Sequence, residues 1–155
     1  MTASGARPNW ASLTKREVAA LGLEVIEARF AREGFETSVD RDRGRTRLTV
    51  RRPGAPAGYE VRAATLRPSP RAYAFLTKAS FAPAHDLLAA LVLLDEGSDP
   101  AAYLIPSTAW HDPSPLLVDR DFIGKASAPE WGISITGKSR PLLEPFSFAG
   151  QAAAL

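Results

Sequence analysis

Glu60 and Arg62 are the residues of this chain whose types and spacing point most directly to chemistry. They are separated by a single residue at the start of a strand-like run, just after a turn at 53–58. A carboxylate can hold Mg²⁺, which neutralises a phosphate and activates water for phosphodiester cleavage. Arg62 can bind phosphate but cannot act as a base, because an arginine side chain is not deprotonated in proteins.

Length and composition favour one soluble globular domain. The chain has 155 residues, of which 45% are hydrophobic and 23% are charged, and this suits a single core. We expect a flexible N-terminus over 1–12 and a single domain over 13–155. The absence of cysteine excludes disulfides and thiolate metal sites. With no signal peptide and no apolar run long enough for a bilayer, the expected location is the cytoplasm.

A helix over roughly 14–33 is the first element that must position these side chains. Thr14 and Glu17 form a capping-box pattern at its start. Apolar residues then recur at close to a helical period. Gly34 is placed where a glycine commonly ends a helix.

Strands account for most of the remaining elements. The segment 45–52 alternates apolar residues with arginine and threonine, which is typical of a half-buried strand in an antiparallel pair. The segment 87–94 is apolar on both faces, which favours a central strand, with a buried helix as the alternative. Further strands are expected at 35–39, 58–66, 73–77, 102–106 and 116–118, and 128–136 is expected to be a loop followed by a strand. This order predicts an α/β fold with a mixed central sheet and one principal N-terminal helix.

The order of these elements resembles the PD-(D/E)XK, or restriction-endonuclease-like, superfamily, over about residues 14–148. The resemblance is carried by Gly22 and Glu24, Glu60-Val61-Arg62, Tyr103-Leu104-Ile105-Pro106 and Pro129-Glu130-Trp131-Gly132-Ile133. It implies a restriction-endonuclease-like fold, in which a Glu-x-Lys beside an upstream Asp holds a divalent metal. This chain has Arg62 in place of the lysine and Arg47 in place of the aspartate. The resemblance therefore implies a nuclease fold with a degenerate metal site.

Other carboxylates offer one way to rebuild a metal site. Asp40 or Asp42, on the polar turn at 40–44, would replace the missing aspartate beside Glu60 and Glu24. An active site would then consist of Glu24, Asp42, Glu60 and Arg62, with Glu60 and Asp42 as the metal ligands. The simpler interpretation is that the turn aspartates bond their own backbone and that Glu60 forms a cross-strand ion pair with Arg47.

Positive charge is concentrated in the first half of the chain. Residues 1–80 hold 15 Lys and Arg against 8 Asp and Glu, whereas the remainder holds 4 against 9. Clustered arginines neutralise phosphates and steer nucleic acid. We therefore expect a phosphate-facing surface, formed by Arg45, Arg47, Arg62 and Arg67. The alternative is a solvated hairpin whose charges bind nothing.

Taken together, the residues favour a nuclease-fold domain that has lost cleavage and acts as a nucleic-acid-binding or interaction module, with DNA or RNA as its partner and no cofactor. One alternative is an active nuclease that uses Mg²⁺ with Glu24, Asp42, Glu60 and Arg62. The other is a protein-interaction subunit that never contacts nucleic acid and forms a homodimer or binds an operon partner. None of the three interpretations involves a membrane.

Overall fold

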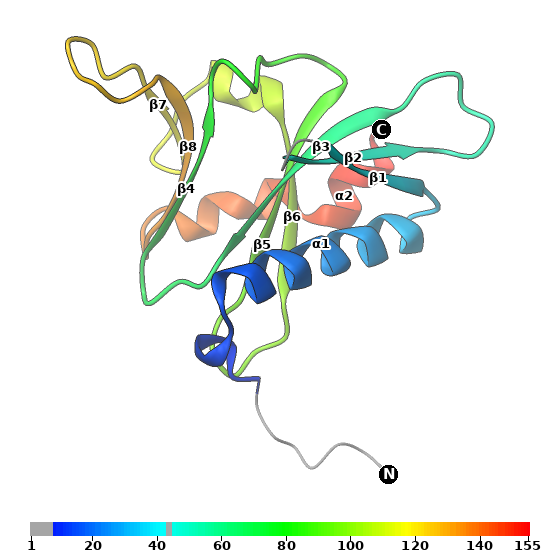
Figure 1. Cartoon of the computed structure of the whole chain (residues 1–155), viewed down its shortest axis with the longest axis horizontal. Coiled ribbons are helices and arrows are strands. Elements are labelled where there is room, and N and C mark those ends of the chain that lie inside the picture. Colours follow the sequence, from blue (N-terminus) through cyan, green and yellow to red (C-terminus); the bar gives the residue numbers. More distant parts are fainter. Residues whose placement is uncertain (1–7, 43–44) are drawn as a thin grey trace.

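The computed structural model describes residues 8–42 and 45–155 (Figure 1). One long helix, α1 (Lys15–Arg32), precedes the strands. The strands are β1 (Glu36–Asp42), β2 (Arg45–Arg51), β3 (Tyr59–Leu66), β4 (Ala72–Thr77), β5 (Leu87–Leu93), β6 (Ala101–Pro106), β7 (Leu117–Arg120) and β8 (Glu130–Ile135). Short helical segments are η1 (Trp10–Ser12), η2 (Ser107–His111), η3 (Arg140–Phe146) and α2 (Phe148–Ala153). Within the described ranges, none of the helices combines the length and the apolar character that crossing a membrane requires.

The strands form two sheets rather than the single sheet that the sequence predicts. One has the order β1-β2-β3-β5-β6 and the other the order β4-β8-β7. In the first sheet β3 and β5 run parallel and the other neighbours run antiparallel, so the predicted mixed α/β arrangement is confirmed. β4, expected to extend this sheet, pairs instead with β8, more than fifty residues further along the chain. A local pattern of residues does not encode such a distant partner.

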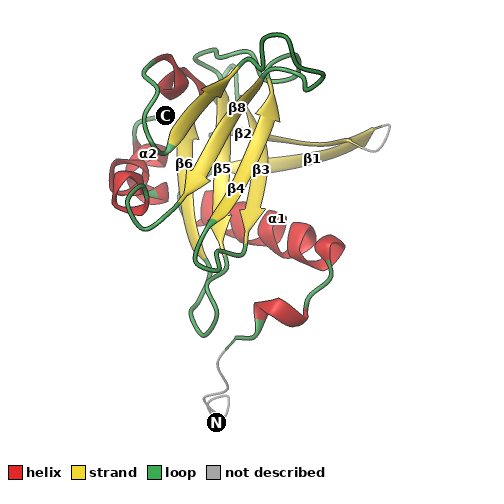
Figure 2. Ribbon diagram, turned by 90° about the vertical axis from the view of Figure 1, so that its left-hand side faces the viewer, coloured by secondary structure: helices red, strands yellow, loops and turns green. Residues whose placement is uncertain are grey.

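β5 shows how α1 and the two sheets are layered. All seven of its residues are buried, as predicted for a central strand. Leu88, Ala90 and Val92 belong to the core beneath α1, whereas Leu87, Ala89, Leu91 and Leu93 belong to the core shared with β4, β7 and β8. The layers are therefore α1, the five-stranded sheet and the three-stranded sheet, with β5 in the middle (Figures 1 and 2).

α1 begins and ends at the predicted residues. The hydroxyl of Thr14 accepts a hydrogen bond from the backbone N–H of Glu17 at 3.1 Å, and the carboxylate of Glu17 accepts one from the N–H of Thr14 at 2.8 Å. The capping box is thus confirmed. Gly34 follows the helix with φ +87, in the left-handed region that favours glycine. The face toward the sheet carries Val18, Leu23, Ile26 and Phe30.

Both described ends of the chain pack against the body of the protein. Trp10, which the sequence places in a flexible stretch, begins η1 and donates its indole N–H to the backbone oxygens of Asp95 and Ser98, at 2.9 and 3.1 Å. At the other end, Phe148 packs edge-on against Phe30, with 4.7 Å between ring centroids. The sequence did not predict η1, η2, η3 or α2, because segments of three to seven residues show no clear helical period.

Gly22 allows α1 to approach β3 closely. A Cβ atom at position 22 would lie 1.8 Å from Oγ1 of Thr65 and 2.9 Å from its Cβ. Such distances are shorter than any real contact, and well-packed interiors do not yield without cost. The present separation between helix and strand therefore requires glycine at this position.

We predict that Gly22→Ala lowers the free energy of unfolding by about 1–2 kcal/mol. Alanine gains about 1 kcal/mol over glycine in helix propensity, but the clash with Thr65, at only 1.8 Å, costs about 2–3 kcal/mol and forces α1 off the sheet. Urea unfolding followed by circular dichroism measures the difference. Gly137→Ala is the matched control, since no atom lies within 4 Å of its added Cβ. Unchanged or increased stability of Gly22→Ala would contradict the packing argument.

Candidate functional site

Glu60 and Arg62 form an ion pair with each other. Both lie on β3, and Nε of Arg62 lies 2.8 Å from Oε2 of Glu60. The same guanidinium donates through Nη2 to the backbone oxygen of Ser80, just after β4, at 3.0 Å. The side chain of Arg62 is 19% exposed and that of Glu60 is 36% exposed. Arg62 therefore holds the Glu60 carboxylate and ties β3 to the segment that follows β4.

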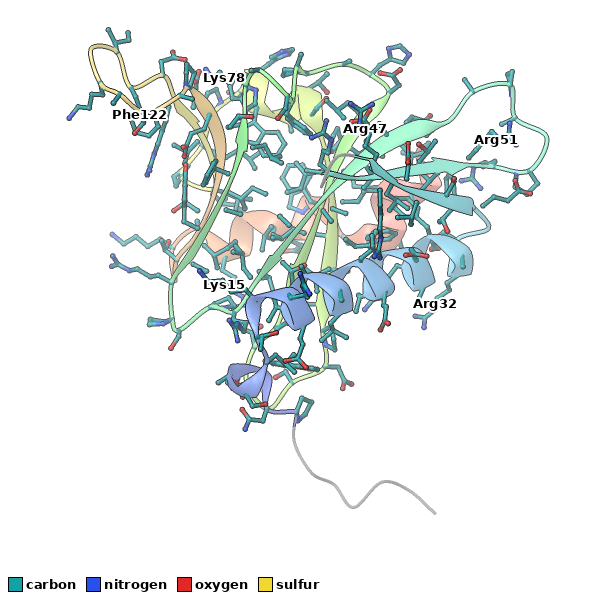
Figure 3. The ribbon with its side chains drawn as sticks, in the orientation of Figure 1. Lys15, Arg32, Arg47, Arg51, Lys78 and Phe122 are labelled. Carbon is teal, nitrogen blue, oxygen red and sulfur yellow. The ribbon has the colours of Figure 1, made fainter. Side chains whose placement is uncertain are left out.

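The register of β2 places Arg47 away from Glu60. Thr49 is the residue opposite Glu60, and Leu48 is opposite Val61. The predicted cross-strand ion pair between Glu60 and Arg47 is therefore wrong. Arg47 lies opposite Asp40 of β1 instead and is exposed on the hairpin (Figure 3).

The structure does not bring Glu24 together with Glu60. Glu24 is exposed on α1, and α1 covers the face of β3 that carries Val61. Side chains alternate along a strand, so Glu60 faces the other side of the sheet. The side chains of Asp42 and Arg45 lie outside the described residues. Among the side chains that are described, no three His, Asp or Glu residues cluster as metal ligands.

These side chains do not fit a magnesium site. Mg²⁺ requires oxygen ligands gathered at about 2.1 Å. Glu60 is the one predicted ligand whose side chain is described, and it is held by a cation. Among the described side chains, no further carboxylates gather beside Glu60 to complete such a ligand set.

Arg67, predicted to face phosphate, is bound to the N-terminal turn. Its Nη1 donates to the backbone oxygens of Trp10 and Leu13, at 3.0 and 2.9 Å. Both partners are neutral backbone carbonyl groups, so neither of them compensates the positive charge of the guanidinium. Arg67 thereby holds the start of α1 beside the end of β3.

A groove runs between β3 and β4, beside the first half of α1. It consists of two adjoining hollows of about 630 and 390 Å³ that share Ala19 of α1 and Ala63 of β3. The groove exists because β2 pairs with β3 only as far as Val61, after which the two strands diverge. We call it the cationic groove, because its charged lining residues are Lys15, Arg16, Arg41, Arg62 and Arg67.

No carboxylate is among the described residues that line the cationic groove. Lys15, Arg16 and Arg41 are exposed, and none forms an ion pair within the described part of the chain. Arg62 is compensated by Glu60. Like charges confined to one concave surface raise the local concentration of anions. The groove is therefore suited to an anionic ligand.

Sequence reasoning found Arg62 and Arg67 but not the other three cations. Lys15 and Arg16 stand in the first turn of a helix, where charged residues are usually solvated. Arg41 was assigned to a polar turn, whereas it belongs to β1. The only sequence signal for these residues is the positive balance of the first half of the chain.

Tyr73, at one end of the groove, is locked to β8. Its ring lies over Gly132, where a Cβ atom would come 2.1 Å from the phenol oxygen. The phenol donates to the buried carboxylate of Glu130. The guanidinium of Arg120 lies over the ring, 4.5 Å from its centroid. Burial, and then the hydrogen bond to Glu130, raise the pKa of Tyr73 to about 12, while Arg120 opposes part of the rise.

Comparisons with protein-family models, with curated proteins and with solved structures each gave no match to this chain. The resemblance to the PD-(D/E)XK superfamily thus stays a prediction.

We predict that calorimetry detects no stoichiometric binding of Mg²⁺ or Mn²⁺, and that the protein does not nick plasmid DNA in their presence. The physical reason is that Arg62 occupies the Glu60 carboxylate. Glu60→Ala and Asp42→Ala should behave like the wild type, as should Glu36→Ala, an exposed carboxylate on β1. Binding or nicking that is lost in Glu60→Ala but kept in Glu36→Ala would establish an active metal site.

The raised pKa of Tyr73 predicts a loss of stability at high pH. The ordinary tyrosine pKa is 10.0 and the folded value is about 12, so the folded chain holds the phenol proton more tightly than the unfolded chain does. This contribution is complete below about pH 10 and disappears as the pH rises through about 12. An ultraviolet titration of tyrosinate should show a transition near pH 12 that Tyr73→Phe removes and Glu130→Gln moves to lower pH. A transition that survives Tyr73→Phe would refute the assignment.

Proposed function

We propose that this protein is a non-catalytic binding module that holds an anionic polymer in the cationic groove. The single observation that carries the proposal is that, among the described residues that line the groove, the five charged ones are all cations. DNA and RNA, the partners expected from the sequence, carry the required charge. An acidic segment of a partner protein carries it as well.

The distribution of the cations supports an extended ligand rather than a single small anion. Lys15 and Arg67 line one hollow, whereas Arg16, Arg41 and Arg62 line the other. The charges therefore follow the length of the groove instead of converging on one point. Each ion pair formed in this way contributes a modest binding free energy, and the affinity falls strongly as the salt concentration rises.

The absence of a cleavage step in this proposal follows from the Glu60–Arg62 pair. The Arg62 cation lies 2.8 Å from the carboxylate that a metal would need and opposes the approach of a second cation. It also connects β3 to Ser80 beside the groove, through the hydrogen bond from Nη2 of Arg62. Glu60 and Arg62 thus take part in a structural contact, and this favours binding over phosphodiester hydrolysis.

Binding of labelled oligonucleotide and of labelled polyglutamate, measured by fluorescence anisotropy over a range of salt, tests the proposal. We expect at least one of the two polymers to bind, with an affinity that falls steeply as salt rises. Arg16→Glu should weaken this binding and reduce the salt slope by about one or more. Neither polymer should be cleaved when Mg²⁺ is present.

Arg32→Glu is the matched control, because it makes the same charge change at the opposite end of the same helix. Figure 3 shows Lys15, the neighbour of Arg16, and Arg32 at the two ends of α1. The two helix positions are separated by about 24 Å at 1.5 Å per residue. No binding of either polymer, or equal losses in Arg16→Glu and Arg32→Glu, would contradict the proposed function.

A further inference from the structure

One edge of β3 is paired along only part of its length. On one side β3 is paired with β5 from Glu60 to Leu66. On the other side its pairing with β2 covers only Tyr59–Val61. The remaining stretch, Arg62–Leu66, therefore has no neighbouring strand on that side within the described part of the chain.

The direction of the backbone groups identifies which residues face the unpaired edge. The N–H of Glu60 donates to the oxygen of Asp86, and the oxygen of Leu66 accepts from the N–H of Leu94. In the even-numbered residues of β3, the backbone N–H and C=O groups therefore point toward β5. Backbone groups alternate between the two edges of a strand, so Ala63 and Thr65 present theirs to the groove.

β4 presents a second unpaired edge to the same groove. It is the outer strand of the three-stranded sheet and is paired with β8 along its whole length. The N–H of Lys78 donates to the oxygen of Pro129, so the backbone groups of the even-numbered residues of β4 point toward β8. Tyr73 and Phe75 consequently direct their backbone groups away from β8, at the edge of β4 that borders the groove.

Both hollows of the cationic groove lie between these two edges. One is lined by Ala63 of β3 and by Leu76 and Thr77 of β4, and the other by Thr65 of β3 and by Ala72 and Tyr73 of β4. β3 and β4 belong to different sheets and are not hydrogen-bonded to each other. Two strands that flank a third lie about 9.5 Å apart, whereas β3 and β4 come within 8 Å of each other where they are closest. An extended chain would therefore join the two sheets through its own backbone where the strands diverge, at the larger hollow.

We propose that the cationic groove binds an extended acidic peptide segment of a partner protein, which adds a strand between β3 and β4. This inference rests on the proposed function, because it names the anionic polymer that the groove holds. The positive charge specifies the acidic character of the ligand, and the unpaired edges specify its extended conformation.

The hydrogen-bonding groups of the two edges favour a peptide over nucleic acid. Each edge offers both N–H donors and carbonyl acceptors, and buried groups of both kinds need partners. A peptide backbone supplies donors and acceptors in alternation. A phosphodiester backbone supplies acceptors only, so it would leave the carbonyls of Ala63 and Thr65 without a donor. Lys15 and Arg16, on α1 above the groove, are then available for the acidic side chains.

A peptide that alternates glutamate and valine, with the length of β4, tests the proposal as a probe. Six residues match β4, whose outer edge has no neighbouring strand within the described part of the chain. Fluorescence anisotropy compares this peptide with a version N-methylated at every second residue, which has the same charge but lacks half of its donors. We expect N-methylation to weaken binding by about tenfold, the effect of one or two lost hydrogen bonds. We also expect the amides of Ala63 and Thr65 to exchange more slowly with the peptide bound.

Proline substitution blocks each edge separately. Ala63→Pro and Phe75→Pro remove N–H groups that face the groove and not a neighbouring strand, a position where strands tolerate proline. Each should weaken peptide binding by about tenfold, whereas Ala63→Ser, which keeps the N–H, should change it by less than about twofold. Should Ala63→Pro fail to fold, Phe75→Pro and the N-methylated peptide give the same information.

The outcomes separate this inference from the proposed function. Equal binding of the two peptides, or no change in amide exchange, would overturn strand addition and leave a purely electrostatic groove. Binding of oligonucleotide but not of peptide would overturn the peptide ligand and retain the anion-binding function. If neither polymer binds, both proposals fall together.

Discussion

The contact between Gly22 of α1 and Thr65 of β3 is the constraint on which the layered structure depends. A helix this close to the sheet brings its apolar face onto β2 and β5, so that Val50, Val92 and Phe30 share one core. The same contact fixes the position of the start of the helix, seven residues or about two turns before Gly22. The packing of the core and the location of the positive charges beside the groove therefore both depend on where α1 lies on the sheet.

β3 connects this packing to the candidate site. Its side chains toward α1 contribute to one core, and those on the other face, at Ala64 and Leu66, pack toward the three-stranded sheet. Its edge toward β5 is continuous, while its other edge is paired and then open. Of the described residues that line the groove, all but Arg67 and Ser80 belong to α1 or to β1–β4, so regular elements rather than loops define it.

Most local structure could be predicted from the sequence, because it depends on interactions between residues that are close together in the chain. The capping box at Thr14, the half-buried alternation of β2 and the apolar run of β5 each appear in a few consecutive residues. The division into two sheets depends on the pairing of β4 with β8, which no short segment reveals. For the site, the sequence singled out Glu60 and Arg62 but assigned Arg47 as the partner of Glu60. Lys15 and Arg41 became lining residues only through the arrangement of α1 and β1 around the groove.

The distant pairing of β4 with β8 also has a consequence for the synthesis of the chain. A polypeptide leaves the ribosome from its N-terminus, so α1 and β1–β3 are available before β5 appears. One face of β5 can be covered by α1 as soon as β5 is made. The other face packs against Ile133 and Ile135 of β8, which are synthesised some forty residues later. During that interval an apolar strand of leucine, alanine and valine has one uncovered face. Apolar surface that stays exposed in this way favours aggregation until the last strand is made.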